Sequence, residues 1–200
     1  MLEVSQTSTP VELISFNINT FKNENIISWS TATEINNKGF EIQRSSLNNL
    51  TDQKTGYKNL GFVTGNGSKT ESSNYSFDDK SLSPGIYFYR LKQIDLGGQS
   101  VYSKEIEAEI KSPVSFNLSQ NYPNPFNPST KIDFTLPENS DVTINMYSII
   151  GELVSTLVHK SFEAGYQFVN FNASGLPSGV YIYRMVAKGF VSVKKMSILK

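Results

Sequence analysis

The stretch NYPNPFNPST, residues 121–130, limits most strongly what this chain can fold into. Each of its three prolines fixes φ at about −65° and has no N–H to donate, and each favours an extended backbone in the preceding residue. Such a stretch cannot be a central strand of a sheet. It instead predicts a rigid lead-in to a domain, with Tyr122 and Phe126 wedged onto the edge of that domain.

Short segments of alternating apolar and polar residues occur on both sides of this lead-in. Residues 24–32, ENIISWSTA, place Ile27 and Trp29 on one face, and residues 131–136, KIDFTL, alternate in the same way. Alanine occurs five times against 19 asparagines and 13 glycines, a composition that favours turns over helices. Short strands separated by turn residues are typical of β-sandwiches, and about seven are expected before Ile110.

One segment fits this alternation less well. ELVSTLVHKSF, residues 152–162, comes nearest to the 3.6-residue period of a helix. A strand is our prediction for it, and a helix is the alternative.

The two sets of segments share a sequence repeat. Residues 75–91 and residues 169–185 align without a gap at an offset of 94 residues. In both, a turn with leucine, proline and glycine leads into a tyrosine-rich strand, as at the tyrosine corner of immunoglobulin-type sandwiches. The alternative to a shared architecture is a chance likeness of two sandwich strands. The identical pairs are Phe77 and Phe171, Leu82 and Leu176, Gly85 and Gly179, Tyr87 and Tyr181, Tyr89 and Tyr183, and Arg90 and Arg184.

We therefore predict an all-β chain that folds as two tandem β-sandwiches of the immunoglobulin type. The first domain is expected at residues 10–110 and the second at residues 118–200. Residues 111–117 are expected to be the linker between them.

Charge and cysteine content exclude several classes of function. The 18 basic and 18 acidic side chains balance, so bulk attraction to nucleic acid or an anionic membrane is not expected. The absence of cysteine excludes disulfides, thiol catalysis and cysteine-ligated metal centres. No run approaches the ~20 apolar residues that span a bilayer. The first ten residues lack the basic and apolar regions of a signal peptide, so if the protein is exported this chain is expected to be a fragment.

The end of the chain is expected to form one local basic strip on a protein that is neutral as a whole. No acid follows Glu163, and the last strand carries Lys194 and Lys195, with Lys200 at the terminus. These lysines either guard an edge strand against aggregation or take part in recognition.

Few side chains fit a catalytic or metal site. His159 is the only histidine, and it lies in a predicted strand with no nucleophile elbow nearby, so neither a histidine pair for a metal nor a serine triad is expected. Asp78, Asp79 and Asp95 are expected to cap turns, with a weak calcium site as the alternative.

Four further acids are candidates for a glycosidase pair. Asp133 and Asp141 could pair with Glu138 or Glu152, but no pattern encloses them as such a pair requires. We predict no enzymatic activity, no cofactor and no metal.

Three stretches of the first half carry a family resemblance. IISWS contains the single Trp29, LSPGIYFYRL at residues 82–91 places a Leu-x-Pro-Gly turn before the tyrosine strand, and GGQSVYS follows at residues 97–103. Together they resemble a fibronectin type III-like domain. The resemblance implies that Trp29, Tyr87 and Tyr89 belong to the core, and it leaves open which tyrosine forms the corner.

A second pairing in the first half is more specific. TATEINNKGFEIQRS at residues 31–45, taken with YRLKQID at residues 89–95, resembles modules that precede the C-terminus of large exported proteins in Bacteroidetes-type bacteria. Such modules are spacers or adhesion units.

The second half resembles another family over about 80 residues. LSQNYPNPFNPSTKIDFTLPE, residues 118–138, is similar to the opening of the C-terminal sorting domain of type IX (Por) secretion cargo. In that family the domain is a small β-sandwich that addresses an exported protein to an outer-membrane translocon. A surface sortase then often removes it, or the cargo is attached to the surface. The later matches are VTINMYSIIGELVSTL at residues 142–157, the Ala164-Gly165 turn, LPSGVYIYRM at residues 176–185 and the lysine-containing end.

These resemblances imply the non-enzymatic C-terminal region of an exported protein, with a spacer or adhesion module before a sorting domain. The expected partners are the type IX translocon and the surface sortase, and the expected location is secreted or at the cell surface, after passage through the periplasm. The residues expected to carry the sorting motif are Pro123, Asn124, Pro125, Phe126, Gly151, Gly165, Gly179, Tyr181, Lys194, Lys195 and Lys200.

Two other functions remain as alternatives. The first domain could bind polysaccharide or a surface partner as a module of an extracellular enzyme, with Tyr57, Tyr75 and Tyr102 as a candidate aromatic platform. The chain could also complete an enzyme site together with residues upstream of it.

Overall fold

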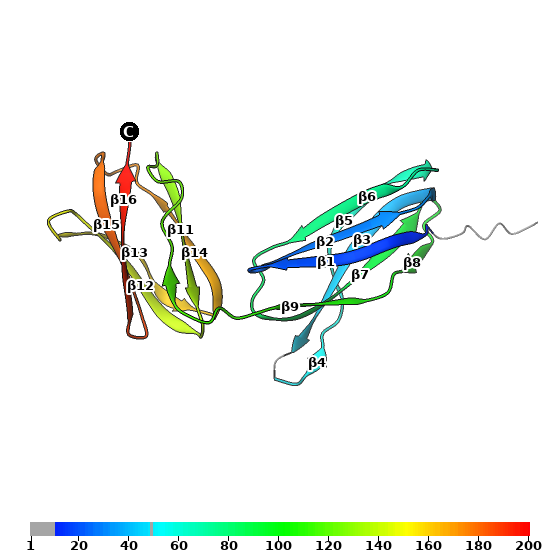
Figure 1. The fold of residues 1–200 in the computed structure, drawn as a ribbon, viewed down its shortest axis with the longest axis horizontal. Coiled ribbons are helices and arrows are strands. Elements are labelled where there is room, and N and C mark those ends of the chain that lie inside the picture. Colours follow the sequence, from blue (N-terminus) through cyan, green and yellow to red (C-terminus); the bar gives the residue numbers. More distant parts are fainter. Residues whose placement is uncertain (1–10, 49) are drawn as a thin grey trace, which may run out of the picture. The chain divides into compact units, whose positions relative to one another are not determined.

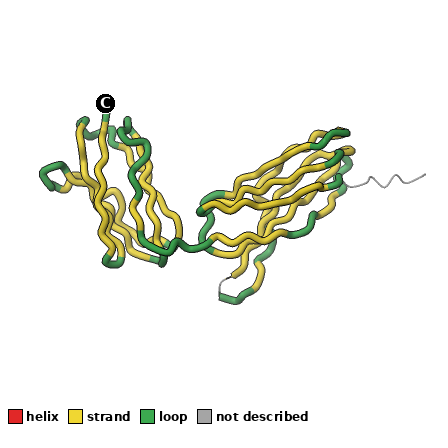
Figure 2. The backbone as a smooth tube through the Cα atoms, viewed as in Figure 1, coloured by secondary structure: helices red, strands yellow, loops and turns green. Residues whose placement is uncertain are grey.

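The fold consists of β-strands joined by turns. The computed structural model describes residues 11–48 and 50–200, and this part of the chain contains strands and no helix (Figure 2). The predicted all-β fold class is therefore confirmed. Residue 10, the expected start of the first domain, lies outside the described residues, as does the N-terminal stretch that was compared with a signal peptide.

The segment for which a helix was the alternative is a strand. β13, Leu153–Phe162, pairs antiparallel with β12, Ser140–Tyr147, and the register of this pair shifts twice. Each shift leaves one residue of β13 without a partner opposite it, as in a β-bulge, and so inverts the alternation beyond that point. The two bulges explain why the sequence of β13 lacks a regular two-residue period.

The strands divide into two compact units, the first ending at Ile110 and the second beginning at Lys111 (Figure 1). We call them unit 1 and unit 2. Their hydrophobic cores share no residue in the described part of the chain.

Unit 1 is a sandwich of antiparallel sheets. One sheet has the strand order β1-β2-β6, and the other is built around β3 and β7, with β5 on the free side of β3 and with β8 and β9 on different parts of β7. Unit 1 has more strands than the about seven expected, partly because β4 and β8 are too short to produce an alternating pattern. The bounds are β1 Leu13–Phe21, β2 Glu24–Thr31, β3 Glu34–Asn48, β4 Gln53–Lys54, β5 Lys58–Lys69, β6 Ser73–Asp79, β7 Gly85–Asp95, β8 Ser100–Tyr102 and β9 Ile106–Ile110.

Unit 2 is a second sandwich with the sheet orders β10-β11-β14 and β13-β12-β15-β16. All pairs within these two sheets are antiparallel. The remaining bounds are β10 Asn117–Leu118, β11 Ser129–Leu136, β14 Gly165–Asn172, β15 Gly179–Ala187 and β16 Phe190–Ile198.

The two units have the same topology. When the short β4 and β8 of unit 1 are left out, the first, second and fifth described strands of each unit form one sheet, and the other strands form the second sheet in the same order. β7 of unit 1 and β15 of unit 2 take the same place, and these are the strands that begin at Gly85 and Gly179 in the sequence repeat. The repeat therefore reflects a shared architecture.

The core of unit 1 is organised around the single tryptophan. Trp29 is 1% exposed, and its ring stacks on Tyr75 with centroids 5.5 Å apart and packs edge-on against Phe40 at 5.4 Å. Large aromatic side chains in this arrangement bury much apolar surface and gain a further contribution from ring geometry. Unit 1 thus depends strongly on Trp29 for its stability.

A buried carboxylate on β3 ties that strand to β2, β5 and β6 of unit 1. Glu34 accepts hydrogen bonds from the hydroxyls of Thr31 and Tyr75, from the Asn37 side chain at 2.8 Å and from the Asn66 N–H at 2.9 Å. Burial opposes ionisation of this group, but the four donors outweigh it and lower its pKa to about 2. Glu34 is therefore a structural anion.

The core of unit 2 follows the alternation that begins after the lead-in. Ile132, Phe134 and Leu136 of β11 are all buried, and Phe134 packs edge-on against Phe162 with ring centroids 5.2 Å apart. The inward residues of β12 and β15 complete the layer, because period-two alternation turns them to the same side.

The tyrosine corner is formed by the first tyrosine of the tyrosine-rich strand in both units. The Tyr87 hydroxyl donates to the Ser83 carbonyl at 2.8 Å, and the Tyr181 hydroxyl donates to the Pro177 carbonyl at 3.1 Å. The second tyrosines of these strands, Tyr89 and Tyr183, are fully buried.

Candidate functional site

The proline-rich lead-in runs along the last strand of unit 2 (Figure 1). The Phe126 N–H donates to the Ser197 carbonyl at 3.0 Å, and the Leu199 N–H donates to the Phe126 carbonyl at 3.0 Å. Asn124 adds a side-chain contact, since its Oδ1 accepts from the Ser197 N–H at 2.8 Å. Phe126 and Ile198 thereby form a parallel bridge. The opening motif and the C-terminal residues are thus one continuous structure, which we call the lead-in junction.

Only one of the two aromatic side chains of the lead-in is inserted into the domain. Phe126 is 2% exposed and packs edge-on against Phe171 with centroids 6.2 Å apart. Tyr122 is 81% exposed, so the expectation that it also wedges onto the domain is wrong. The reason is its register: Tyr122 bridges to Lys131 in antiparallel fashion, and residues opposite one another point to the same side. Because Lys131 is exposed, Tyr122 faces outward with it.

The prolines of the lead-in are on its surface. Pro123, Asn124 and Pro125 are exposed, and the peptide bonds that precede Pro123, Pro125 and Pro128 are cis. The outer surface of the lead-in is therefore made by prolines and by Tyr122, with Phe126 directed inward.

Asn121 fastens the start of the lead-in to the core. Its side chain donates to Thr130 Oγ1 at 2.9 Å and to the Pro123 carbonyl at 3.1 Å, and its N–H donates to the Tyr183 hydroxyl at 2.9 Å. That hydroxyl in turn donates to the Ser119 carbonyl at 2.8 Å. Burial raises the pKa of Tyr183 to about 12, although the N–H of Asn121 acts in the other direction. Tyr183 is therefore a neutral anchor.

Sequence reasoning did not select Asn121 or Tyr183 as site residues. The available signal was the repeat, which aligns Tyr183 with Tyr89, a tyrosine already assigned to the core. The partners of the hydroxyl are far from it along the chain, so no local pattern identifies them.

The C-terminal lysines do not form a single strip. Lys194 pairs with Tyr183 and Lys195 pairs with Ile182 across β15 and β16. Tyr183 points into the core and Ile182 points out, so the two adjacent lysines lie on opposite sides of the sheet. The expectation of one basic strip is corrected to two separate cations, with Lys200 exposed beyond the end of β16.

Most of the remaining motif residues lie at the same end of unit 2 as the lead-in junction. Gly179 pairs with Ile198, and Tyr181 forms the corner two residues later. Gly151 is in the turn between β12 and β13, where its φ of 87° requires a residue without a side chain. Gly165 is separate from these, since it pairs with Leu136 at the far end of β11.

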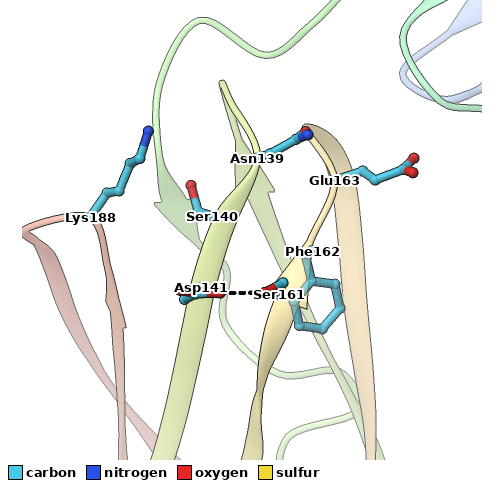
Figure 3. Close-up of a pocket in the computed structure, with 7 residues that line it drawn as sticks. All are labelled: Asn139, Ser140, Asp141, Ser161, Phe162, Glu163 and Lys188. Carbon is cyan, nitrogen blue, oxygen red and sulfur yellow. Dashed lines mark hydrogen bonds between the residues drawn. The ribbon is translucent and has the colours of Figure 1, made fainter.

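An open cavity of about 530 Å³ lies at that far end (Figure 3). Ser161 donates to the carboxylate of Asp141, and Lys188 is paired with Glu138 at 2.6 Å. The charged groups of the cavity thus have partners within the protein. Its lining residues are Asn139, Ser140, Asp141, Ser161, Phe162, Glu163 and Lys188.

The histidine is near this cavity but is not arranged for catalysis. His159 Nδ1 lies 2.8 Å from Thr143 Oγ1, while Ser161 donates directly to Asp141. A serine triad requires the histidine between the serine and the acid. The order of contacts here is different, so these residues do not form a triad.

The acids considered as a glycosidase pair have other partners. Asp133 is paired with Lys131 at 2.8 Å, and Glu138 is paired with Lys188. Glu152 lies in the exposed turn between β12 and β13. Across the described residues, no group of three or more histidines and acids could hold a metal ion.

Asp79 is a structural group and not a turn cap. It is 8% exposed at the end of β6, where Arg44 Nη1 donates to both of its carboxylate oxygens at 2.8 and 2.9 Å. The Tyr89 hydroxyl also donates to it at 2.7 Å. Burial lowers the pKa of Arg44, but the hydrogen bond and charge of Asp79 outweigh it and raise that pKa. The prediction was wrong because these partners are distant in the sequence.

Asp95, by contrast, caps the turn after β7, accepting from the Gln99 N–H at 2.8 Å.

The aromatic platform suggested for unit 1 is not assembled. Tyr75 belongs to the core, stacked on Trp29. Tyr57 and Tyr102 lie on either side of Arg90, whose guanidinium carbon is 3.8 and 4.1 Å from the two ring centroids. The ring faces therefore already hold a cation.

Comparison with known families identifies the family of residues 120–199, which lie in unit 2. The family model described as "Secretion system C-terminal sorting domain" matches residues 120–199. Residues 120–199 are a type IX secretion sorting domain. The match includes the whole lead-in, residues 121–130, and the whole of β16, which are the two parts that form the lead-in junction. The resemblance found in the sequence is thereby confirmed for these residues.

Further comparisons add little to this assignment. Among solved structures, the chain is similar to dimeric latent PorU from Porphyromonas gingivalis, with 17% identity and a TM-score of 0.36. The match covers 98% of this chain and 21% of that one, so this chain spans about a fifth of its length. No curated protein matches the chain.

The sorting domain sets the broad function of the chain. A domain of this family is a non-catalytic C-terminal signal, marks a secreted or cell-surface protein and implies contact with the type IX machinery. In the residues that the structure describes, no helix has the length and apolar character needed to cross a membrane.

Proposed function

We propose that this chain is the C-terminal region of an exported cargo protein, in which unit 2 is the address and unit 1 is a spacer or adhesion module. The observation that carries the proposal is the family match over residues 120–199, together with the lead-in junction. The junction supports it because it fixes the two sequence-distant parts of the motif in one place, where a single partner can contact both.

The proposal includes the fate of the cargo at the outer membrane. The translocon takes up the cargo through unit 2, and the surface sortase then removes unit 2 or attaches the cargo to the surface. The residues proposed to carry the address are those of the lead-in junction, Gly151, Gly179, Tyr181, and Lys195 and Lys200. Gly165 and Lys194 are proposed to act through folding, since Gly165 lies at the far end of the unit and Lys194 on the core side of the sheet.

An export assay tests the proposal. A reporter with a signal peptide is fused to residues 1–200, and a matched fusion ends at residue 111. In a host with a type IX system, the first fusion is expected at the surface or in the medium and the second in the periplasm. Export of the shorter fusion at the level of the longer one would show that unit 2 is not the address.

A polysaccharide-binding role for unit 1 is the second candidate. Tyr102 is 49% exposed and is the aromatic side chain of the suggested platform most open to solvent. The arrangement around Arg90 weighs against this role, because the faces of Tyr57 and Tyr102 already contact its guanidinium. A glycan array with the full chain separates the candidates: binding that is lost in Tyr102→Ala would favour the module over the spacer.

A further inference from the structure

One face of unit 2 exposes a group of apolar side chains on the side of a sheet that points away from the core. On the sheet β13-β12-β15-β16, the residues that point away from the core include three half-exposed valines and Leu153, which is 59% exposed. Val180 is 48% exposed, Val191 is 49% exposed and Val193 is 52% exposed. Antiparallel sheets usually present polar residues on the side that faces water. We call this side of the sheet the outer face.

The register shows that these side chains form one surface. Val191 pairs with Val186 and Val193 pairs with Arg184, while Ile182 pairs with both Lys195 and Tyr147. Cross-strand neighbours on one side of a sheet are in contact, so the apolar residues run from β16 across β15 to the end of β12. Leu153 continues the same row on β13, since it pairs with Tyr147.

The adjoining turn extends this surface. Ile149 is 71% exposed and Ile150 is 75% exposed, both in the turn between β12 and β13 (Figure 1). Neither isoleucine belongs to the hydrophobic core cluster found in the described part of unit 2. Contiguous exposed apolar surface of this kind marks interaction sites.

The opposite sheet of the same unit provides a comparison. On the outward side of β11, Lys131 and Asp133 form a salt bridge at 2.8 Å. β14 contributes the exposed Asn170 and Phe168 there, and the lead-in contributes Tyr122, which faces the same way as Lys131; Phe168 is 46% exposed and Tyr122 is 81% exposed. The exposed apolar side chains of the outer face are thus concentrated on β15, on β16 and at the start of β13, while Thr143 and Asn145 of β12 and Thr156 and His159 of β13 make the rest of that face polar.

The charged side chains in the middle of the outer face are all basic. Arg184 lies between the valines of β15 and β16, and Lys195 lies beside Ile182; both are exposed. Neither has an acidic partner among the described residues. The nearest acids by register, Asp141 and Glu152, are at the two ends of the face, and no acid follows Glu163 in the sequence.

We propose that the outer face of unit 2 is a docking surface for a protein segment that presents apolar side chains flanked by carboxylates. The apolar rows supply buried area, and Arg184 and Lys195 select a partner of opposite charge. A second copy of the same face is a poor occupant, since β15 and β16 would bring only further cations to it. The inference rests on the proposed function, because it assigns this face to the partner that reads the sorting domain.

Export of the full chain fused to a reporter tests the face. Val191→Thr with Val193→Thr keeps branched strand residues but removes apolar surface, and Arg184→Glu with Lys195→Glu reverses the charge. Each pair is expected to lower the exported fraction about tenfold or more, the effect of a ~1.4 kcal/mol loss in binding. Phe168→Thr and Lys160→Glu are the controls, expected to stay within about twofold of the parent. Thermal unfolding of each variant checks that the fold is retained.

The outcomes separate this inference from the proposed function. Normal export of both face variants, with the fusion that ends at residue 111 still retained, would overturn the docking surface and leave the sorting role intact. Export of that shorter fusion would overturn both the docking surface and the proposed sorting role of unit 2.

The chemistry of the occupant is tested by a photo-crosslinking amino acid placed at Val193 in the exporting host, with the same amino acid at Phe168 as the control. The expected adduct at Val193 is to a protein peptide that contains apolar residues and Asp or Glu, with little or none at Phe168. An adduct to lipid or to a second copy of the chain, or equal adducts at the two positions, would overturn the proposal.

Discussion

Tyr87 and Tyr181 make the same hydrogen bond in the two units, each donating its hydroxyl to the carbonyl four residues before it, at Ser83 and Pro177. The bond holds the turn that precedes β7 in unit 1 and β15 in unit 2. It ties the start of each of these strands to the turn before it. Both tyrosines belong to the sequence repeat at an offset of 94 residues, so the repeat includes this shared corner.

The next tyrosine of each strand has a different use in the two units. Tyr89 donates to Asp79 and accepts from the Asn25 side chain, so its hydroxyl joins two strands of unit 1. Tyr183 donates to Ser119 and accepts from Asn121, so its hydroxyl holds the lead-in. Tyr183, which is equivalent to Tyr89 of unit 1, thus connects the core of unit 2 to the lead-in, the segment proposed to carry the address.

Tyr183→Phe is expected to destabilise unit 2 by about 1–3 kcal/mol, because it leaves the buried N–H of Asn121 and carbonyl of Ser119 without this partner. Urea unfolding of the full chain measures the change. Tyr181→Phe is the matched control: its hydroxyl bond is exposed, and its loss is expected to cost less. A Tyr183→Phe variant no less stable than Tyr181→Phe would contradict the anchoring role.

Trp29→Ala is expected to cost about 3–5 kcal/mol in unit 1, as removal of a large buried side chain does. The stacking of Trp29 on Tyr75 adds to this cost. Fluorescence provides an independent measurement, since Trp29 is the single tryptophan and is expected to emit at short wavelength and to be poorly quenched. Emission like that of free tryptophan in the folded chain would rule out the buried position.

The fold class and the core strands could be predicted because they depend on local alternation. Ile132, Phe134 and Leu136 are buried as a period of two requires, and the same rule places Trp29 inside. The same rule also separates Lys194 from Lys195, so the expectation of one basic strip could have been rejected from the sequence.

Other features could not be predicted because their partners are distant in the sequence. Asp79 was expected at a turn, but Arg44, 35 residues earlier, holds it inside. Tyr122 is exposed because it is placed opposite Lys131, a register that no local pattern specifies. The apolar outer face is likewise visible only when β15 and β16 are aligned.

Acid is expected to destabilise unit 1 through Glu34. Its pKa is about 2 in the folded chain against 4.5 for an ordinary glutamate, so the ionised form is stabilised by folding. The resulting stability is fully present above about pH 4.5 and is lost as the pH falls toward 2. The unfolding free energy measured across this range should fall with pH in the parent and fall less in Glu34→Gln. The exposed Glu71→Gln serves as the control, and a Glu34→Gln profile as steep as that of the control would contradict the assignment.

The two units are expected to fold independently. Their cores share no residue in the described part of the chain, and each exceeds the ~60 residues at which domains become marginally stable alone. Residues 1–111 and 112–200, expressed separately, should each give a β-sheet circular dichroism spectrum and a cooperative thermal transition. If either half is disordered under conditions in which the full chain is folded, the units are not independent domains.

The two aromatic residues of the lead-in are expected to respond very differently to the same substitution. Phe126 is buried against Phe171, so Phe126→Ala should destabilise unit 2 by about 3–5 kcal/mol. Tyr122 is exposed, so Tyr122→Ala should stay within about 0.5 kcal/mol of the parent. Chemical unfolding of both variants measures the difference, and the export assay then separates folding from recognition.

Tyr122→Ala, with its fold intact, should lower export if a partner contacts the outer surface of the lead-in. Normal export of this variant would restrict recognition to other parts of unit 2, and equal stability of the two variants would show that Phe126 does not hold the junction together.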